Sequence, residues 1–271
     1  MLVGIPIAIG LAAIGAGRAA APAPDTVLLE ELTSTEVGAL VRAGTTTVIV
    51  PVGGTEQNGP HMALGKHNAR ARALSERIAR ALGRTLVAPV VAYVPEGGLA
   101  PPTGHMRFPG TLTVPEPVFE KLLESAARSL KLHGFRDVVF IGDHGGTQAG
   151  QQAVAARLNR EWAGTSVRAH AVTEYYRAAD DEFRRLLEAR GYGAAEVGRH
   201  AGLADTSLSL AVDPRLVRTD RLRPGTGLAN GDGVDGDPTR ASAELGQLGV
   251  DAIVARTVQA IRAALAAPAR R

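Results

Sequence analysis

The 271-residue sequence contains no cysteine. Disulfide bonds and thiolate metal ligands are therefore excluded, and any transition metal has to be held by histidine and carboxylate side chains. Export stays open, because a chain of this length can bury a core that is stable without disulfides. The hydrophobic and charged fractions, 45% and 21%, are those of an ordinary globular protein, so we expect one large domain.

The sequence also lacks a marked excess of one charge. Lysine and arginine outnumber aspartate and glutamate by 30 to 27, which gives a formal net charge of +3. The arginines between Arg70 and Arg84 and between Arg177 and Arg190 are interleaved with acidic residues such as Glu76 and Asp180, a pattern typical of solvated helix faces. We therefore expect no nucleic-acid partner.

Residues 1–17 form an apolar run that is followed by Arg18 and a stretch of alanine and proline. This pattern predicts a signal peptide over residues 1–23, with cleavage near Ala21 or Ala23, and a periplasmic or secreted protein with no stable membrane span after processing. An uncleaved anchor is the alternative, because no basic residue precedes the run. The run is short for a membrane span, which needs about 20 residues.

Between residues 28 and 267, short apolar segments alternate with segments of helical periodicity. The expected strands are residues 45–52, 86–94, 137–141 and 166–172. The expected helices are residues 28–43, 69–82, 115–132, 148–162 and 174–190, with one or two more within 239–267. This alternation predicts an α/β fold in three layers, α/β/α, with a mostly parallel sheet. Residues 95–109 and 222–237 are expected to be loops.

Two clusters of ligand-type side chains follow predicted strands. The first contains Glu56, Asn58, His61 and His67, and the second contains Asp143 and His144, followed by two glycines. Because reactive residues lie at the carboxyl ends of parallel strands, we expect both clusters at one edge of the sheet. Two imidazoles and a carboxylate can hold a divalent ion that keeps open positions for water or substrate.

Five motifs in this order resemble the creatininase family, from about Thr47 to Gly246. They are EQNGPH at 56–61, FPGT at 108–111, DHGG at 143–146, HAGLADTS at 200–207 and GVDGDP at 233–238. The resemblance implies a creatininase-like domain over residues 28–267, amide hydrolysis, a site for two metal ions and a homo-oligomer, commonly a hexamer.

Two positions depart from the family pattern. His67 stands where the family has a bridging aspartate, and Asn58 stands where it has a histidine ligand of the second ion. An imidazole cannot bridge two ions as a carboxylate does, and an amide oxygen is a poor ligand for zinc-like metals. We therefore predict one divalent ion, Zn, Mn or Fe, held by Glu56, His67 and His144.

His200 matches the family histidine that passes a proton to the leaving group, and Asp205 stands where the family usually has glutamate. Either is a candidate general acid or base. Asp205 has an alternative interpretation as a cap or dipole partner of a helix N-terminus.

The remaining candidates carry weaker expectations. Asn58, His61, His105 and Asp143 are further site residues; His61 is expected to shape its loop and His105 to face the cleft. Lys66 is interpreted as a solvated loop lysine, with binding of an acidic substrate group as the alternative. His133 and His170 are expected to be structural.

The predicted function is a metal-dependent amidohydrolase that acts on a small amide, cyclic ones included, through metal-activated water. Creatinine itself is not expected as substrate, because the departures fall on metal ligands. The alternatives are a non-catalytic metal- or ligand-binding descendant of the family and a metal-assisted isomerase. Two histidines and one carboxylate also occur in non-haem iron oxygenases, so the ligands alone do not exclude redox chemistry.

Overall fold

The computed structural model describes residues 24–227 and 231–267. The expected signal peptide over residues 1–23 lies outside this part of the chain. Among the helices in the described residues, none is both long and apolar enough to cross a membrane.

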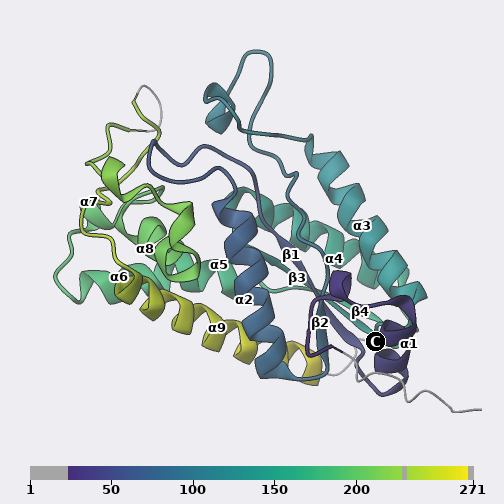
Figure 1. Cartoon of the computed structure of the whole chain (residues 1–271). Helices are drawn as coiled ribbons and strands as arrows, with labels where there is room; N and C mark the ends of the chain where they lie inside the picture. Colours follow the sequence, from purple (N-terminus) through teal and green to yellow (C-terminus); the bar gives the residue numbers. More distant parts are fainter. Residues whose placement is uncertain (1–23, 228–230, 268–271) are drawn as a thin grey trace, which may run out of the picture.

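The centre of the fold is a parallel four-stranded sheet (Figure 1). Its strands are β1 (Thr47–Val52), β2 (Thr85–Val87), β3 (Asp137–Gly142) and β4 (Arg168–Ala171), in the order β2-β1-β3-β4. β1 pairs with β3 along its whole length, from Thr47 beside Asp137 to Val52 beside Gly142. The chain moves from β1 to β2 on one side and returns to β3 on the other, so the gap between β1 and β3 is a topological switch point. Ligands bind at the carboxyl ends of the strands beside such a point.

Helices cover both faces of the sheet, as the alternation of apolar segments predicted. Ile49 and Val139 pack on one face, against α2 (Lys66–Leu82), α8 (Leu203–Val212) and α9 (Ala243–Ala266). Val48 and Val50 point the opposite way, into a second core with α1 (Ser34–Arg42), α3 (Glu116–Leu132) and α4 (Gln148–Glu161). Because side chains alternate along a strand, a continuous apolar strand supplies both cores.

Three expected elements were wrong in extent. The helix expected over residues 28–43 is a 3-10 turn (Leu29–Glu31) and α1, separated by Thr33, whose hydroxyl and backbone form a capping box with Glu36. The strand expected to reach Val94 ends at Val87, because the segment containing Pro89 cannot continue a regular ladder. The helix expected over residues 174–190 consists of α5 (Glu174–Arg177), a π-helical turn (Ala178–Glu182) and α6 (Phe183–Glu188).

α7 (Ala194–Val197) was not expected from the sequence, and α8 was implied only by the alternative interpretation of Asp205 as a partner of a helix N-terminus. Short 3-10 turns complete the described elements, at Gly104–Arg107, Gly145–Thr147, Pro214–Leu216 and Thr219–Arg221. α8 is the consequential addition, because it carries Asp205 in its first turn, next to α2.

Candidate active site

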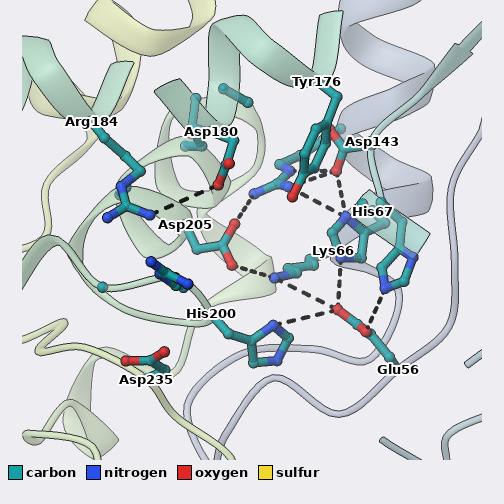
Figure 2. A pocket seen from close by; sticks show the side chains of 18 of the residues that line it. Glu56, Lys66, His67, Asp143, Tyr176, Asp180, Arg184, His200, Asp205 and Asp235 are labelled. Carbon is teal, nitrogen blue, oxygen red and sulfur yellow. Dashed lines mark hydrogen bonds and ion pairs between the residues drawn. The ribbon is translucent and has the colours of Figure 1, made fainter. Parts of the chain in front are cut away.

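A cavity of about 470 Å³ opens at the carboxyl edge of the sheet (Figure 2). Glu56 reaches it from the loop after β1, and His144 from the turn after β3. His105 comes from the loop between β2 and α3, and His200 from the segment before α8. The cavity therefore lies at the switch point that the sheet order defines.

The Glu56 carboxylate is buried at the floor of this cavity, and its Oε2 atom faces two histidines. His144 Nε2 lies 3.0 Å from Oε2, and His105 Nε2 lies 3.2 Å from it. The side chain of Glu56 has no solvent exposure. Although burial raises the pKa of Glu56, the neighbouring His67 and His144 outweigh it and hold that pKa well below its ordinary value.

The other oxygen of Glu56, Oε1, faces a different set of groups (Figure 2). His67 Nε2 lies 2.7 Å away, His200 Nδ1 3.7 Å and Lys66 Nζ 3.9 Å. Glu56 thus lies between two subsites, one on each carboxylate oxygen.

Glu96 is the site residue that sequence reasoning missed. Its side chain is fully buried, both carboxylate oxygens lack a hydrogen-bond donor, and His144 Nε2 lies 3.2 Å from Oε2. Burial and the neighbouring Glu56 charge raise the pKa of Glu96 to about 9. A carboxylate in this position needs a cation beside it to be ionised at neutral pH. Glu96 follows Pro95 directly after an apolar segment, so the rule that selected Glu56 and His144 would have selected it too.

Glu96 completes a group that could hold a metal ion. Glu56, Glu96, His105 and His144 each offer one ligand atom, and these four atoms lie within 4.8 Å of one another. The orphaned Glu96 oxygens fit a cation, and two carboxylates with two imidazoles suit zinc, manganese or iron. Compared with the ligands expected from the sequence, this group contains Glu96 and His105 in place of His67.

His67 nevertheless lies beside the group, with its ring centroid 5.2 Å from that of His144. Its two nitrogens are both engaged, since Nδ1 lies 2.6 Å from Asp143 Oδ2 and Nε2 2.7 Å from Glu56 Oε1. The three side chains expected to form the metal site therefore meet at Glu56, and the role of His67 as a ligand stays a prediction.

A buried ionic network extends from His67 toward α8. Arg70 donates to Asp143 Oδ2 from Nε at 2.9 Å and Nη2 at 2.6 Å, and from Nη1 to Asp205 Oδ1 at 2.7 Å. Tyr175 donates its hydroxyl to the other oxygen of Asp143 at 2.8 Å. Burial alone would raise the pKa of Asp143, but the charge of Arg70 holds it below its ordinary value. Asp143 is thus the partner that orients His67.

Lys66 belongs to the same network, and the interpretation as a solvated loop lysine was wrong. Its side chain has no solvent exposure, and Nζ donates to Asp205 Oδ2 at 2.5 Å. Asp205 also accepts from the backbone N–H of Ala201 at 2.9 Å, so it contacts both the start of its own helix and the side chains of α2. Partial burial raises the pKa of Asp205, but Lys66 and Arg70 outweigh it and hold that pKa well below its ordinary value.

His200 lies at the cavity wall with Nε2 2.9 Å from the backbone oxygen of Gln57. Because a carbonyl oxygen only accepts, Nε2 carries the proton in this contact, and Nδ1 faces Glu56. Burial and the charge of Lys66 lower the pKa of His200 to about 3, so the ring is neutral at physiological pH.

The other candidates lie in supporting positions. Asn58 donates to the backbone oxygens of Glu56 and Ala63 at 2.8 and 3.1 Å, which fixes the loop. His61 is buried, with Nε2 3.0 Å from Thr206 Oγ1, in keeping with the expected loop-shaping role. His133 is the C-cap of α3, and His170 pairs with Asp137 at 2.9 Å across neighbouring strands.

Comparison with protein families matches residues 30–261 to Creatininase, described as creatinine amidohydrolase. The mycofactocin precursor peptide peptidase of Mycolicibacterium smegmatis is 30% identical over 226 residues, which cover 74% of this chain and 78% of the relative. The creatinine amidohydrolase of Pseudomonas putida is 28% identical over 200 residues, 73% of this chain and 76% of the relative.

Solved structures agree with the sequence comparison. A creatininase described with Mn covers 89% of this chain and 100% of its own, at a TM-score of 0.73 and 25% identity. A variant creatininase described as Zn-Zn type covers 90% and 100%, at a TM-score of 0.73 and 26% identity. The match of sheet, motifs and most of the chain length leads to one conclusion: this chain belongs to the creatininase family.

Proposed function

We propose that this chain is a metal-dependent amidohydrolase that cleaves the C–N bond of an amide. One observation carries the proposal. Glu96 is a buried carboxylate with no hydrogen-bond donor, and it lies with Glu56, His105 and His144 in a group of suitable ligand atoms. Burying an ionised carboxylate without a partner is costly, so such a position is expected to serve a cation.

Glu56, Glu96, His105 and His144 would hold the ion, with His67 beside them. A divalent ion in such a site supplies Lewis-acid polarisation of a carbonyl and lowers the pKa of water. The donor set suits Zn, Mn or Fe, and we infer one ion per site.

The protein groups account for the proton transfers of amide hydrolysis. The Nδ1 atom of His200 lies at the cavity floor, 3.7 Å from Glu56 Oε1, so it is placed to accept the proton of the attacking water as the C–O bond forms. The same proton then passes to the nitrogen as the C–N bond breaks, which yields a carboxylic acid and an amine. Asp205 is bound to Lys66, Arg70 and a backbone N–H, so we assign it to support and not to proton transfer.

The proposed substrate is a small amide, with cyclic amides and short peptides as the candidates. A cavity of about 470 Å³ lies within the size range of small-molecule sites. The relatives named above act, by their names, on creatinine and on a precursor peptide. Both names support amide chemistry, but they do not decide between a small cyclic amide and a peptide as the substrate.

The test uses the full chain loaded with Zn²⁺ or Mn²⁺ and a panel of cyclic amides and short peptides, with products identified by mass spectrometry. We expect hydrolysis of at least one member, its loss after chelation, and recovery on adding metal back. Glu56→Gln should abolish turnover, whereas Glu76→Gln on the outer part of α2 should not. A metal-loaded chain that turns over nothing would favour a binding protein, and a product of unchanged mass would favour an isomerase.

Two further expectations concern location and assembly. We propose that residues 1–23 are removed on export to the periplasm or the medium, which sequencing of the mature N-terminus in a native host would check. We also infer a homo-oligomer, which the family resemblance implies. Light scattering after size exclusion would contradict this if it gave the mass of a single chain.

A further inference from the structure

Lys66 is a buried lysine at a position that disfavours positive charge. It is the first residue of α2, where backbone N–H groups point outward and favour anions. The helix has no acidic residue in its first turn and no side-chain hydrogen bond at its N-cap, Gly65. Since the side chain has no solvent exposure, the ammonium has to be compensated by groups from other elements.

Two carboxylates from separate elements provide that compensation. Asp205 Oδ2 of α8 lies 2.5 Å from Lys66 Nζ, and Glu56 Oε1 of the loop after β1 lies 3.9 Å from it. The second oxygen of Asp205 is taken by Arg70. A cation enclosed by carboxylates from different parts of the chain is the usual setting of a bound metal ion, but this cation is attached to the protein.

Glu56 therefore separates two cation positions of different kinds. Its Oε2 faces the group with Glu96, where one carboxylate has no hydrogen-bond donor. Its Oε1 faces Lys66, where the neighbouring carboxylates are already paired. A divalent ion on the Oε1 side would lie a few ångströms from a fixed ammonium, and like charges at that distance repel strongly in a buried site.

We propose that Lys66 is the permanent second cation of this site, which limits the chain to one divalent ion, bound on the Oε2 side of Glu56. The place of that one ion rests on the proposed function. Lys66 is a positioning residue, because it acts through Glu56 and Asp205. The chain therefore departs from a two-ion site for two reasons. Lys66 places a positive charge at the second position, and His67 and Asn58 stand where the family has metal ligands.

Removing the ammonium should convert its place into a metal site. The groups around that place are the carboxylates of Glu56 and Asp205, with His67 Nε2 and His200 Nδ1 also facing Glu56 Oε1. Carboxylate and imidazole are ligands that Mn²⁺ and Zn²⁺ accept. In Lys66→Met the aliphatic bulk of the side chain is approximately kept, whereas its charge is lost.

The test counts Mn²⁺ ions per chain by equilibrium dialysis and elemental analysis, with Mn²⁺ alone as the probe. We expect one ion in the unmodified full chain and two in Lys66→Met. Lys121→Met is the matched control, because Lys121 also pairs with a carboxylate, Glu124, but is exposed on α3. It should leave the count at one, and so should Lys66→Arg, which keeps the charge.

One Mn²⁺ ion per chain in folded Lys66→Met would overturn the proposal. Two Mn²⁺ ions per chain in the unmodified protein would also overturn it, and that measurement needs no variant. Lys66→Gln replaces Lys66→Met if the latter does not fold, with the same expected count of two. An unmodified chain that binds no Mn²⁺ would instead reject the proposed function. In that case one ion gained by Lys66→Met would still support the role of Lys66, and none gained would overturn it.

Discussion

Glu96 Oε2 lies 3.2 Å from His144 Nε2, although Glu96 follows the β2 segment and His144 follows β3, two strands that are not neighbours. β1 lies between them and contributes Glu56 to the same point. The carboxyl ends of three strands thus deliver one side chain each, and the parallel sheet brings them together.

The first prediction concerns this contact. Glu96→Gln removes a negative charge that has no protein donor, so the affinity for Zn²⁺ or Mn²⁺ should fall by at least about 10- to 100-fold. Competition with a chelating dye would measure it. Glu76→Gln is the control, and equal affinities of Glu96→Gln and the unmodified chain would exclude Glu96 as a ligand.

A second prediction concerns the buried arginine of the network. Arg70→Met leaves Asp143 and Asp205 with fewer partners in a buried place, so the free energy of unfolding should fall by about 3–5 kcal/mol. Arg72→Met, two residues along the same helix, breaks only exposed pairs with Glu30 and Glu31 and should cost less than about 1 kcal/mol. Urea unfolding compares the two, and similar losses would contradict the assigned role of Arg70.

A third prediction tests the contact between α8 and α9. A Cβ atom on Gly246 would overlap the backbone oxygen of Ser207 and lie 2.8 Å from the Ala211 side chain. Gly246→Ala should therefore destabilise the fold by about 1–3 kcal/mol, since a packed crossing cannot absorb the methyl group. Gly38→Ala in α1 would meet only the flexible end of Arg42 and should be neutral or stabilising by up to about 1 kcal/mol. Thermal unfolding of both variants checks the contrast.

A fourth prediction concerns pH and the Glu124 side chain. Burial raises its pKa, but hydrogen bonds from Arg128 and Arg157 outweigh this and keep it below the ordinary value of 4.5. The folded protein therefore holds this proton less tightly than the unfolded chain. The stabilisation by Glu124 is complete above the pKa that this side chain has in the unfolded chain. It is lost as pH falls through the lower pKa of the folded protein. The difference in melting temperature between the unmodified chain and Glu124→Gln should shrink as the solution is acidified below pH 4.5, and a constant difference would contradict the assignment.

Strand ends were predictable because the pattern that defines them is local. The runs at Thr47–Val52 and Asp137–Gly142 are apolar on both faces, as a parallel sheet requires, and polar residues follow each one. Glu56 and His144 were expected together for this reason, and in the structure His144 Nε2 lies 3.0 Å from Glu56 Oε2. Glu96 follows the strand expected over residues 86–94, but it was missed because no second ligand-type side chain stands beside it in the sequence.

Lys66 and Asp205 illustrate what could not be predicted. Nothing in the sequence near Lys66 indicates burial, and its partner lies on α8, a helix that the sequence implied only through the alternative interpretation of Asp205. The burial and the ion pair both depend on how α2 packs beside α8.

The sequence by itself determined the family, the alternation of strands and helices, and the two strand ends that carry Glu56 and His144, since these depend on neighbouring residues and motif order. Only the tertiary structure decided which nitrogens and oxygens meet at Glu56. It also decided that Glu96 lacks a hydrogen-bond donor and that Lys66 lies on the Oε1 side of Glu56. Such contacts depend on packing distances between segments remote in the chain, and no local pattern specifies them.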